Sequence, residues 1–331
     1  MTSSAAWPRL LLVVAALAAA TACAFWPLAV YGVTLALFGV PHALVELQWV
    51  GRRYGSWRTL APFVVGGLAL VALARIASLS FGWEATTAAT FELGLGMVLV
   101  ALVLPRDLRR CGLRCGMALA VLLVLGIGVA ASPIDALLVL AIAHNLTPAG
   151  FVADRLRDGD SRPGERVRYA AAGLLAFVAL PVWLATGSAA SLLGLESAHS
   201  TADDLVVGGT LGLGLFDGLL AFTPSFVPPS RSLDLLRAVA FLQVVHYVAV
   251  LLVMPRLGAR PASERRAPSS PPRLAFPALV LFLGLVFATA FVVDFREAKA
   301  TYGVLAAVHV WLEFPALLLA LTPRALVPAV S

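Results

Sequence analysis

Long apolar segments dominate the chain and are separated by short polar intervals. A helix that spans a bilayer needs about 20 predominantly apolar residues. The segments that approach this length are residues 9–27, 28–50, 60–82, 86–104, 112–131, 133–153, 168–190, 205–227, 235–254, 273–294 and 301–322. This pattern predicts an all-α fold, a polytopic integral membrane helical bundle with about nine to eleven transmembrane helices.

No polar interval is long enough to mark a domain boundary. The longest, residues 255–273, is rich in Pro, Ser and Arg and is expected to form a flexible basic loop on the cytoplasmic side. No convincing signal-peptide cleavage site separates the first apolar run from the second, so the first run is expected to be retained as a helix. We therefore expect residues 1–331 to form a single integral membrane domain.

Arginine residues gather in three intervals and predict the orientation of the chain. The clusters are Arg52, Arg53 and Arg58; Arg106, Arg109, Arg110 and Arg114; and Arg155, Arg157, Arg162, Arg166 and Arg168. Two predicted spans separate each cluster from the next, so the positive-inside rule places all three on the cytoplasmic side. Three predicted spans separate the last cluster from the basic loop at 255–273, which breaks the alternation. Either the glycine-rich segment 205–227 does not cross the membrane fully, which is the interpretation we favour, or the basic loop is an exception to the positive-inside rule.

The composition excludes an ordinary soluble domain, because 60% of the residues are hydrophobic and 13% are charged, whereas a soluble globule is roughly one quarter charged. The formal net charge of +6 then reports orientation in a membrane, with the bacterial inner membrane as the expected location, rather than a nucleic-acid partner. The expected partners are membrane lipid and a hydrophobic small-molecule substrate from the bilayer, while the oligomeric state stays open. The odd number of cysteines argues against structural disulfides.

Four of the five histidines fall inside apolar segments, namely His42, His144, His246 and His309, while His199 lies in a polar segment. Ionisable groups in hydrocarbon are costly, so they normally face the interior of a helical bundle and have partners there. Neutral imidazole is the commonest transition-metal ligand, and ligands on four separate helices can close a site across a bundle. The four buried histidines are therefore candidate metal ligands, with Fe(II) as the expected cofactor and Zn as the alternative.

The predicted orientation places His42, His144 and His246 in the cytoplasmic half of their segments and His309 nearer the opposite face. A shared site then requires a tilted last helix. Separate structural or proton-relay roles for the four histidines are the alternative to a metal site.

Glutamates follow two of these histidines by four residues, Glu46 after His42 and Glu313 after His309. Residues spaced by four share one face of a helix, so each glutamate is expected to point into the same space as its histidine. Either glutamate can bind metal directly or accept the outer N–H of a histidine ligand. Tyr247, in a later apolar segment, is a proton donor, a wall of the site or a helix-packing residue. Glu46, Glu313 and Tyr247 are the candidate catalytic residues.

Other polar residues of the apolar segments each have competing interpretations. The residues Asn145, Thr147 and Pro148, which follow His144, either support the site or form a cluster that ends a helix. Glu92 and Asp217 are further acids whose distance from the histidines the sequence does not give. Arg75 lies near the end of its segment and is expected to extend to the lipid headgroups.

The element Gly39-Val40-Pro41-His42 in an early helix and the pair His246-Tyr247 in a later one resemble the bacterial Brp/Blh family of membrane β-carotene 15,15′-dioxygenases. The resemblance covers short motifs around single histidines and not the whole chain. It implies nonhaem Fe(II) held by His42, His144, His246 and His309, which cleaves the central double bond of β-carotene to give retinal. The family's early motif continues as Pro-His-Gly with a following Asp, whereas this chain has Pro-His-Ala-Leu-Val-Glu. Another lipid-soluble substrate is therefore equally open.

The sequence contains no GxxxxGK[ST] loop, no dinucleotide fingerprint and no HExxH motif, so nucleotide hydrolysis, nicotinamide chemistry and thermolysin-like proteolysis have no support. The leading hypothesis is a membrane-embedded, metal-dependent oxygenase, with nonhaem iron, that acts on a lipid-soluble substrate such as a carotenoid or another isoprenoid. One alternative is a zinc-dependent lipid hydrolase in which Glu46 or Glu313 is the general base. The others are a proton-coupled transporter that uses the intramembrane His and Glu residues and a haem-binding quinol redox protein.

Overall fold

The computed structural model of the protein describes residues 7–53, 61–104, 112–157, 163–195, 223–257 and 275–320. Within these ranges the chain forms helices joined by short turns, without any strand. The prediction of an all-α helical bundle is therefore confirmed for the described part of the chain.

The helices coincide with the apolar segments and are bounded by the polar intervals between them. Their bounds are α1 Trp7–Phe25, α2 Pro27–Arg53, α3 Ala61–Phe81, α4 Ala85–Leu102, α5 Gly112–Ala131, α6 Pro133–His144, α7 Thr147–Arg157, α8 Pro163–Leu174, η2 Leu175–Ala179, α9 Leu180–Ala185, α10 Ser188–Leu192, α14 Pro229–Val248, η4 Ala249–Val253, α15 Met254–Leu257, α16 Ala275–Val293 and α17 Phe295–Ala320. The two η segments are π-helical turns inside longer helices.

Among the described residues, seven helical stretches are long and apolar enough to cross a membrane, and the number rises to eight if α6 and α7, bent by 42°, count as one span. Shorter apolar helices run over Val13–Phe25 and Cys115–Ala131. These lengths are compatible with an integral membrane protein, while the expected total of nine to eleven spans stays a prediction. The expected segment 205–227 falls almost entirely outside the described residues, as does most of the basic loop at 255–273.

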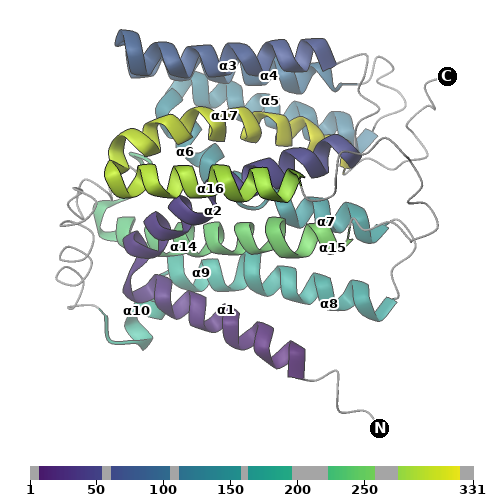
Figure 1. Ribbon diagram of the computed structural model, residues 1–331, viewed down its shortest axis with the longest axis vertical. Helices are drawn as coiled ribbons and strands as arrows, with labels where there is room; N and C mark the ends of the chain where they lie inside the picture. The colour runs from purple at the N-terminus through teal and green to yellow at the C-terminus, as the bar shows by residue number, and fades with distance from the viewer. Residues whose placement is uncertain are drawn as a thin grey trace.

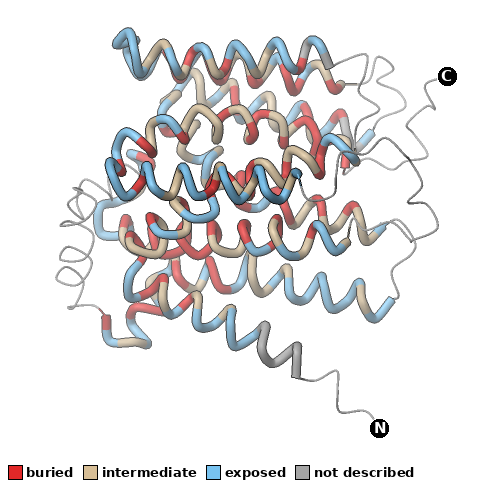
Figure 2. The backbone as a smooth tube through the Cα atoms, in the orientation of Figure 1, coloured by how far each residue is buried: buried red, intermediate tan, exposed pale blue. Residues whose placement is uncertain are grey.

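The helices lie alongside one another, with α3 and α4 at one side of the bundle and α1, α8 and α9 at the other (Figure 1). Helix α2 is central, since it packs against α14, α16 and α17. Buried positions concentrate on the inner helices, whereas α16 and α3 expose much of their surface (Figure 2). The exposed side chains of the outer helices are large and apolar, as Leu73, Leu281, Phe282 and Leu285 illustrate. Such a surface suits contact with lipid.

Two polar contacts join helix ends at the arginine-rich end of the bundle. Arg53, the last residue of α2, donates hydrogen bonds from Nε and Nη2 to Oδ2 of Asp154 in α7, at 3.1 and 2.9 Å. Arg155 donates from Nε to the carbonyl of Leu257, the last residue of α15, at 2.7 Å. The end of α15 therefore lies beside the first and third arginine clusters, which agrees with the side expected for the basic loop that begins there.

The opposite end of the bundle brings together the end of α9 and the start of α14 (Figure 1). Arg231 of α14 donates from Nη1 to the carbonyl of Thr186, at 3.0 Å. Ser225, in the turn before α14, donates its backbone N–H to Oδ1 of Asp135, near the start of α6, at 2.8 Å. These bonds fix the entry of α14, the helix that carries His246.

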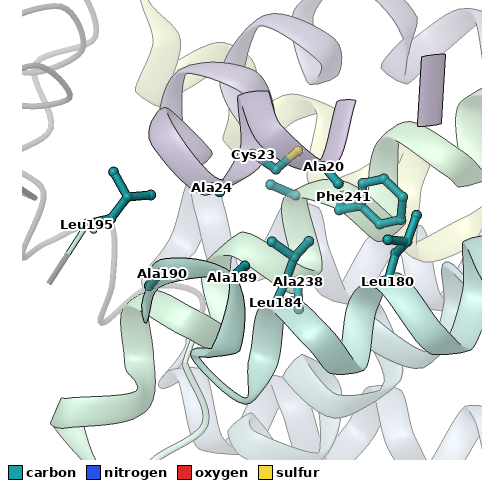
Figure 3. Packing of buried hydrophobic residues seen from close by; sticks show 11 residues of the cluster. Ala20, Cys23, Ala24, Leu180, Leu184, Ala189, Ala190, Leu195, Ala238 and Phe241 are labelled. Carbon is teal, nitrogen blue, oxygen red and sulfur yellow. The ribbon is translucent and has the colours of Figure 1, made fainter. Parts of the chain in front are cut away.

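Small residues allow close packing where α1 meets α9, α10 and α14 (Figure 3). Ala20, Cys23 and Ala24 of α1 lie against Leu184 and Phe241, and small side chains let helix backbones approach in this way. Cys23 is a free, buried thiol.

Cys115, in contrast, is disulfide-bonded. The expectation that disulfides are absent is therefore wrong. An odd number of cysteines prevents complete pairing but leaves two of three free to bond.

Candidate metal centre

The four candidate histidines lie on four different helices of the bundle. His42 is in the middle of α2, His144 ends α6, His246 lies near the end of α14, and His309 is in the second half of α17. Their exposed fractions are 1%, 7%, 0% and 1%. All four imidazoles are thus enclosed by protein.

Their ring nitrogens converge on one point. One nitrogen from each histidine lies within 4.8 Å of a nitrogen of each of the other three. Four points that lie no more than 4.8 Å from one another fit inside a sphere whose radius is about 0.61 times 4.8 Å. The centre of this sphere therefore lies about 2.9 Å or less from all four nitrogens. A Zn–N bond is about 2.0–2.1 Å long. Inward shifts of under about 1 Å therefore bring four imidazoles to bonding distance.

Local sequence features place each histidine. Pro41 precedes His42 inside α2, and its Cγ would be 2.9 Å from a Cβ at Gly284, so α16 approaches α2 closely there. His144 stands at the 42° bend between α6 and α7, where Nδ2 of Asn145 donates to the carbonyl of Ala141 at 3.0 Å. The π-helical turn η4 follows His246 almost directly, and such turns often occur at functional sites.

The hydrogen bond of His42 assigns its free nitrogen. Nδ1 lies 3.0 Å from the carbonyl oxygen of Phe38, four residues earlier in α2. A carbonyl only accepts, so Nδ1 carries the proton and Nε2 keeps its lone pair. Nε2 is buried and has no hydrogen-bond partner. It is available as a metal ligand.

Glu313 joins two of the helices that carry the histidines. Its Oε2 lies 2.7 Å from Nδ1 of His144 and accepts a hydrogen bond from Oγ1 of Thr147 at 2.7 Å. A carboxylate that accepts from a histidine fixes the ring orientation and leaves the other nitrogen for a metal. Thr147, whose role the sequence leaves open, therefore supports the site.

Glu46 lies beside Glu313 and the histidine group. Its Oε2 is 3.4 Å from Nε2 of His246, and the oxygen has no hydrogen bond of good geometry. Oε1 of Glu313 is 3.5 Å from Nε2 of His309. One ligand atom from each of Glu46, His309 and Glu313 also lies within 4.8 Å of the other two.

Unpartnered polar atoms at this centre test whether a metal ion fits. Most buried polar atoms in proteins have a hydrogen-bond partner. Here the following buried atoms have none: Nε2 of His42, Nδ1 and Nε2 of His246, Nδ1 and Nε2 of His309, both carboxylate oxygens of Glu46, and Oε1 of Glu313. Imidazole nitrogens and carboxylate oxygens that face one another without hydrogen bonds of good geometry are of the kind that bind a cation. The residues therefore fit a metal ion.

Tyr247 covers one side of the centre. Its ring centroid lies 4.3 Å from that of His42, with the planes tilted by 38°. The ring is 5% exposed. Tyr247 is a wall of the site and contacts a ligand candidate rather than the point where the nitrogens converge.

Glu313 points into the same space as His309, with its Oε1 3.5 Å from Nε2 of His309, and its shortest contact is with His144 of another helix, at 2.7 Å. The expected position of His309 is corrected. His309 is not displaced from the other three histidines, because a ligand nitrogen of each lies within 4.8 Å of the others. Helix α17 begins at Phe295, before the predicted start at residue 301, so His309 lies near the middle of its helix.

Arg75 does not simply extend to headgroups. Its Nη2 donates to Oε1 of Glu92 at 3.0 Å, and Trp311 Nε1 donates to the same oxygen at 3.0 Å. Glu92 thus belongs to a separate network that ties α3, α4 and α17 together. Asp217 and His199 lie outside the described residues.

Comparisons with known proteins add no relatives. No family model matches the chain, and neither curated proteins nor solved structures give a significant match.

Proposed function

We propose that this protein is an integral membrane metalloprotein in which His42, His144, His246 and His309 bind a transition-metal ion. The observation that carries the proposal is the convergence of four buried imidazoles, from four helices, within 4.8 Å of one another. Hydrogen bonding between helices is the usual role of a lone intramembrane histidine. That role does not account for the ring nitrogens of His42, His246 and His309 that make no hydrogen bond.

The surrounding charge supports a divalent ion. Four neutral imidazoles bring no negative charge, and an uncompensated divalent ion in an apolar bundle is costly. Glu46 and Glu313, each 1% exposed, offer two carboxylates beside the histidines. Ionised carboxylates here offset the charge of one divalent ion, and the ion in turn favours their ionised form.

We further propose that the metal is nonhaem iron and that the protein is an oxygenase for a lipid-soluble substrate, such as a carotenoid or another isoprenoid. A ferrous ion bound by imidazoles would supply the site for activating dioxygen. The chain itself excludes water, because the centre is enclosed, and it orients the ligands through Phe38, Glu313 and Thr147. The motif resemblance to the Brp/Blh family and the apolar outer surface support this substrate class.

The proposed location rests on the distribution of arginine residues. Arginine-bearing helix ends gather at one end of the bundle, which supports a cytoplasmic side and a bacterial inner membrane. The substrate and membrane lipid are then the partners of the protein.

Metal analysis of detergent-purified protein tests the centre. His42→Ala and His246→Ala are expected to lose the ion, whereas His199→Ala, outside the apolar segments, is the matched control and should retain it. Unchanged metal content in the first two variants would show that the centre does not bind metal. Oxygen consumption with β-carotene and other isoprenoids then tests the oxygenase.

A zinc-dependent lipid hydrolase is the second candidate, because one observation favours it. Both carboxylate oxygens of Glu46 lack hydrogen bonds, which leaves this residue free to accept a proton as a general base. Ester hydrolysis by zinc-loaded protein, without oxygen uptake, would favour the hydrolase. The same assay on Glu46→Gln should then show a loss of turnover with metal retained.

A further inference from the structure

A second group of ligand atoms overlaps the histidine centre. Glu46 of α2 and Glu313 and His309 of α17 each offer one atom within 4.8 Å of the other two. Each of the three side chains is 1% exposed. Only His309 is shared with the group of four histidines.

The carboxylate oxygens of this group lack donors. Neither oxygen of Glu46 accepts a hydrogen bond, and Oε1 of Glu313 accepts none. A buried acceptor without a donor costs about 1–3 kcal/mol, and more if charged. Oε2 of Glu313 differs, because Thr147 and His144 both bond to it. Two of these oxygens, Oε2 of Glu46 and Oε1 of Glu313, lie 3.4 and 3.5 Å from Nε2 of His246 and of His309. All three face the interior without a hydrogen bond of good geometry.

Glu92 shows what a satisfied buried carboxylate looks like in this bundle. It is 3% exposed, and it accepts from Arg75 and from Trp311. The chain thus supplies well-placed donors to Glu92, whereas neither oxygen of Glu46 has a hydrogen bond of good geometry. A cation is the partner that such oxygens lack.

We propose that Glu46 and Glu313, with His309, bind a second divalent metal ion next to the ion of the histidines. The inference rests on the proposed function, since it adds a position to the same centre. When both ions are bound, His309 serves the second ion and His42, His144 and His246 hold the first, so each ion has three protein ligands. With one ion bound, all four histidines are available to it, as in the proposed function. Three protein ligands with open positions are the pattern of catalytic metal sites.

The two positions differ in ligand chemistry. The first is built from nitrogens, whereas the second is rich in carboxylate oxygens, which suit Mn(II) and Fe(II). Ions in two-metal sites lie about 3.5–4 Å apart, and the two groups of ligand atoms have His309 in common. Two carboxylates offset half the charge of two divalent ions, so the pair of ions attracts an anionic ligand between them.

Ion stoichiometry tests the second position. The full-length protein in detergent is loaded anaerobically with Fe(II), desalted and measured for iron per chain. We expect two ions for the unmodified protein, one for Glu46→Gln, and two for the matched control Glu92→Gln. Circular dichroism checks that both variants keep their helix content.

Each outcome separates the two proposals. No iron in the unmodified protein overturns the proposed function itself. One iron in both the unmodified protein and Glu46→Gln overturns the second position and leaves the histidine centre standing. If Glu46→Gln does not fold, loading the unmodified protein with Mn(II) decides by paramagnetic resonance: a spin-coupled pair supports the inference, and isolated Mn(II) signals refute it.

Discussion

The contact between Gly96 of α4 and Trp311 of α17 gives a quantitative prediction. A Cβ placed on Gly96 would meet the ring atoms Cζ3, Cη2 and Cε3 of Trp311, with Cε3 at 2.6 Å and the other two closer. Carbon atoms in good contact lie about 3.5–4.0 Å apart. The indole ring must therefore retreat by about 1 Å or more in Gly96→Ala.

The ring has little freedom to retreat. Trp311 is 2% exposed and packs in a cluster with Val71, Leu99 and Leu125, and its Nε1 is held by Glu92. Overpacking of this kind costs about 1–3 kcal/mol, and the confinement favours the upper end. Alanine in a helix interior gains about 0.5–1 kcal/mol over glycine. We expect Gly96→Ala to lower the free energy of unfolding by about 2 kcal/mol.

Gly94 supplies a control in the same helix. A Cβ at Gly94 meets nothing within 4 Å, so Gly94→Ala should raise the free energy of unfolding by about 0.5–1 kcal/mol. Equilibrium unfolding in mixed detergent micelles, followed by circular dichroism, measures both. Gly96→Ala should also weaken metal binding, because Trp311 lies two residues from His309 in α17.

Two results would refute this reasoning. Equal stability changes for Gly94→Ala and Gly96→Ala would show that the clash is absent. A cost of Gly96→Ala that persists in a Trp311→Leu background would show that the indole ring is not its cause.

Three further predictions follow from single contacts. Thr147→Val removes the hydroxyl that bonds Glu313 and should weaken metal affinity about tenfold; unchanged affinity in chelator competition would contradict the supporting role. Tyr247→Phe keeps the ring beside His42 and should leave metal content unchanged, whereas Tyr247→Ala should lower it. A double-mutant cycle on Arg53→Ala and Asp154→Ala should give a coupling of about 1 kcal/mol or more, since the side chains are 18% and 8% exposed; no coupling would show that water screens the pair.

The sequence predicted the helices and the histidine group for physical reasons. Apolar runs of about 20 residues have few other folds available, and the structure places a helix over each predicted run within its described ranges. Imidazoles in such runs are costly unless they meet partners. This cost singled out His42, His144, His246 and His309 without knowledge of how the helices pack.

The partners of the glutamates were not accessible from the sequence. The four-residue spacing correctly puts Glu313 on the face of His309, but the shortest contact of Glu313 reaches His144 on another helix. Contacts between helices depend on rotation and separation, which a hydrophobic pattern fixes only coarsely. The contact between Arg75 and Glu92 was not predictable for the same reason. Glu92 becomes a neighbour of Arg75 only when α3 packs on α4.

The burial of the histidines has a kinetic consequence for metal exchange. With exposed fractions of 0–7%, an ion among them reaches water only when helices separate locally, and such openings have free energies between zero and that of global unfolding. When capture by a chelator outpaces reclosing, the rate of ion loss equals the opening rate and no longer depends on chelator concentration. The lifetime of a bound ion is then set by the rate at which the helices separate locally rather than by the strength of the metal–ligand bonds. Metal loading is expected to be fastest during folding, before the helices have packed together.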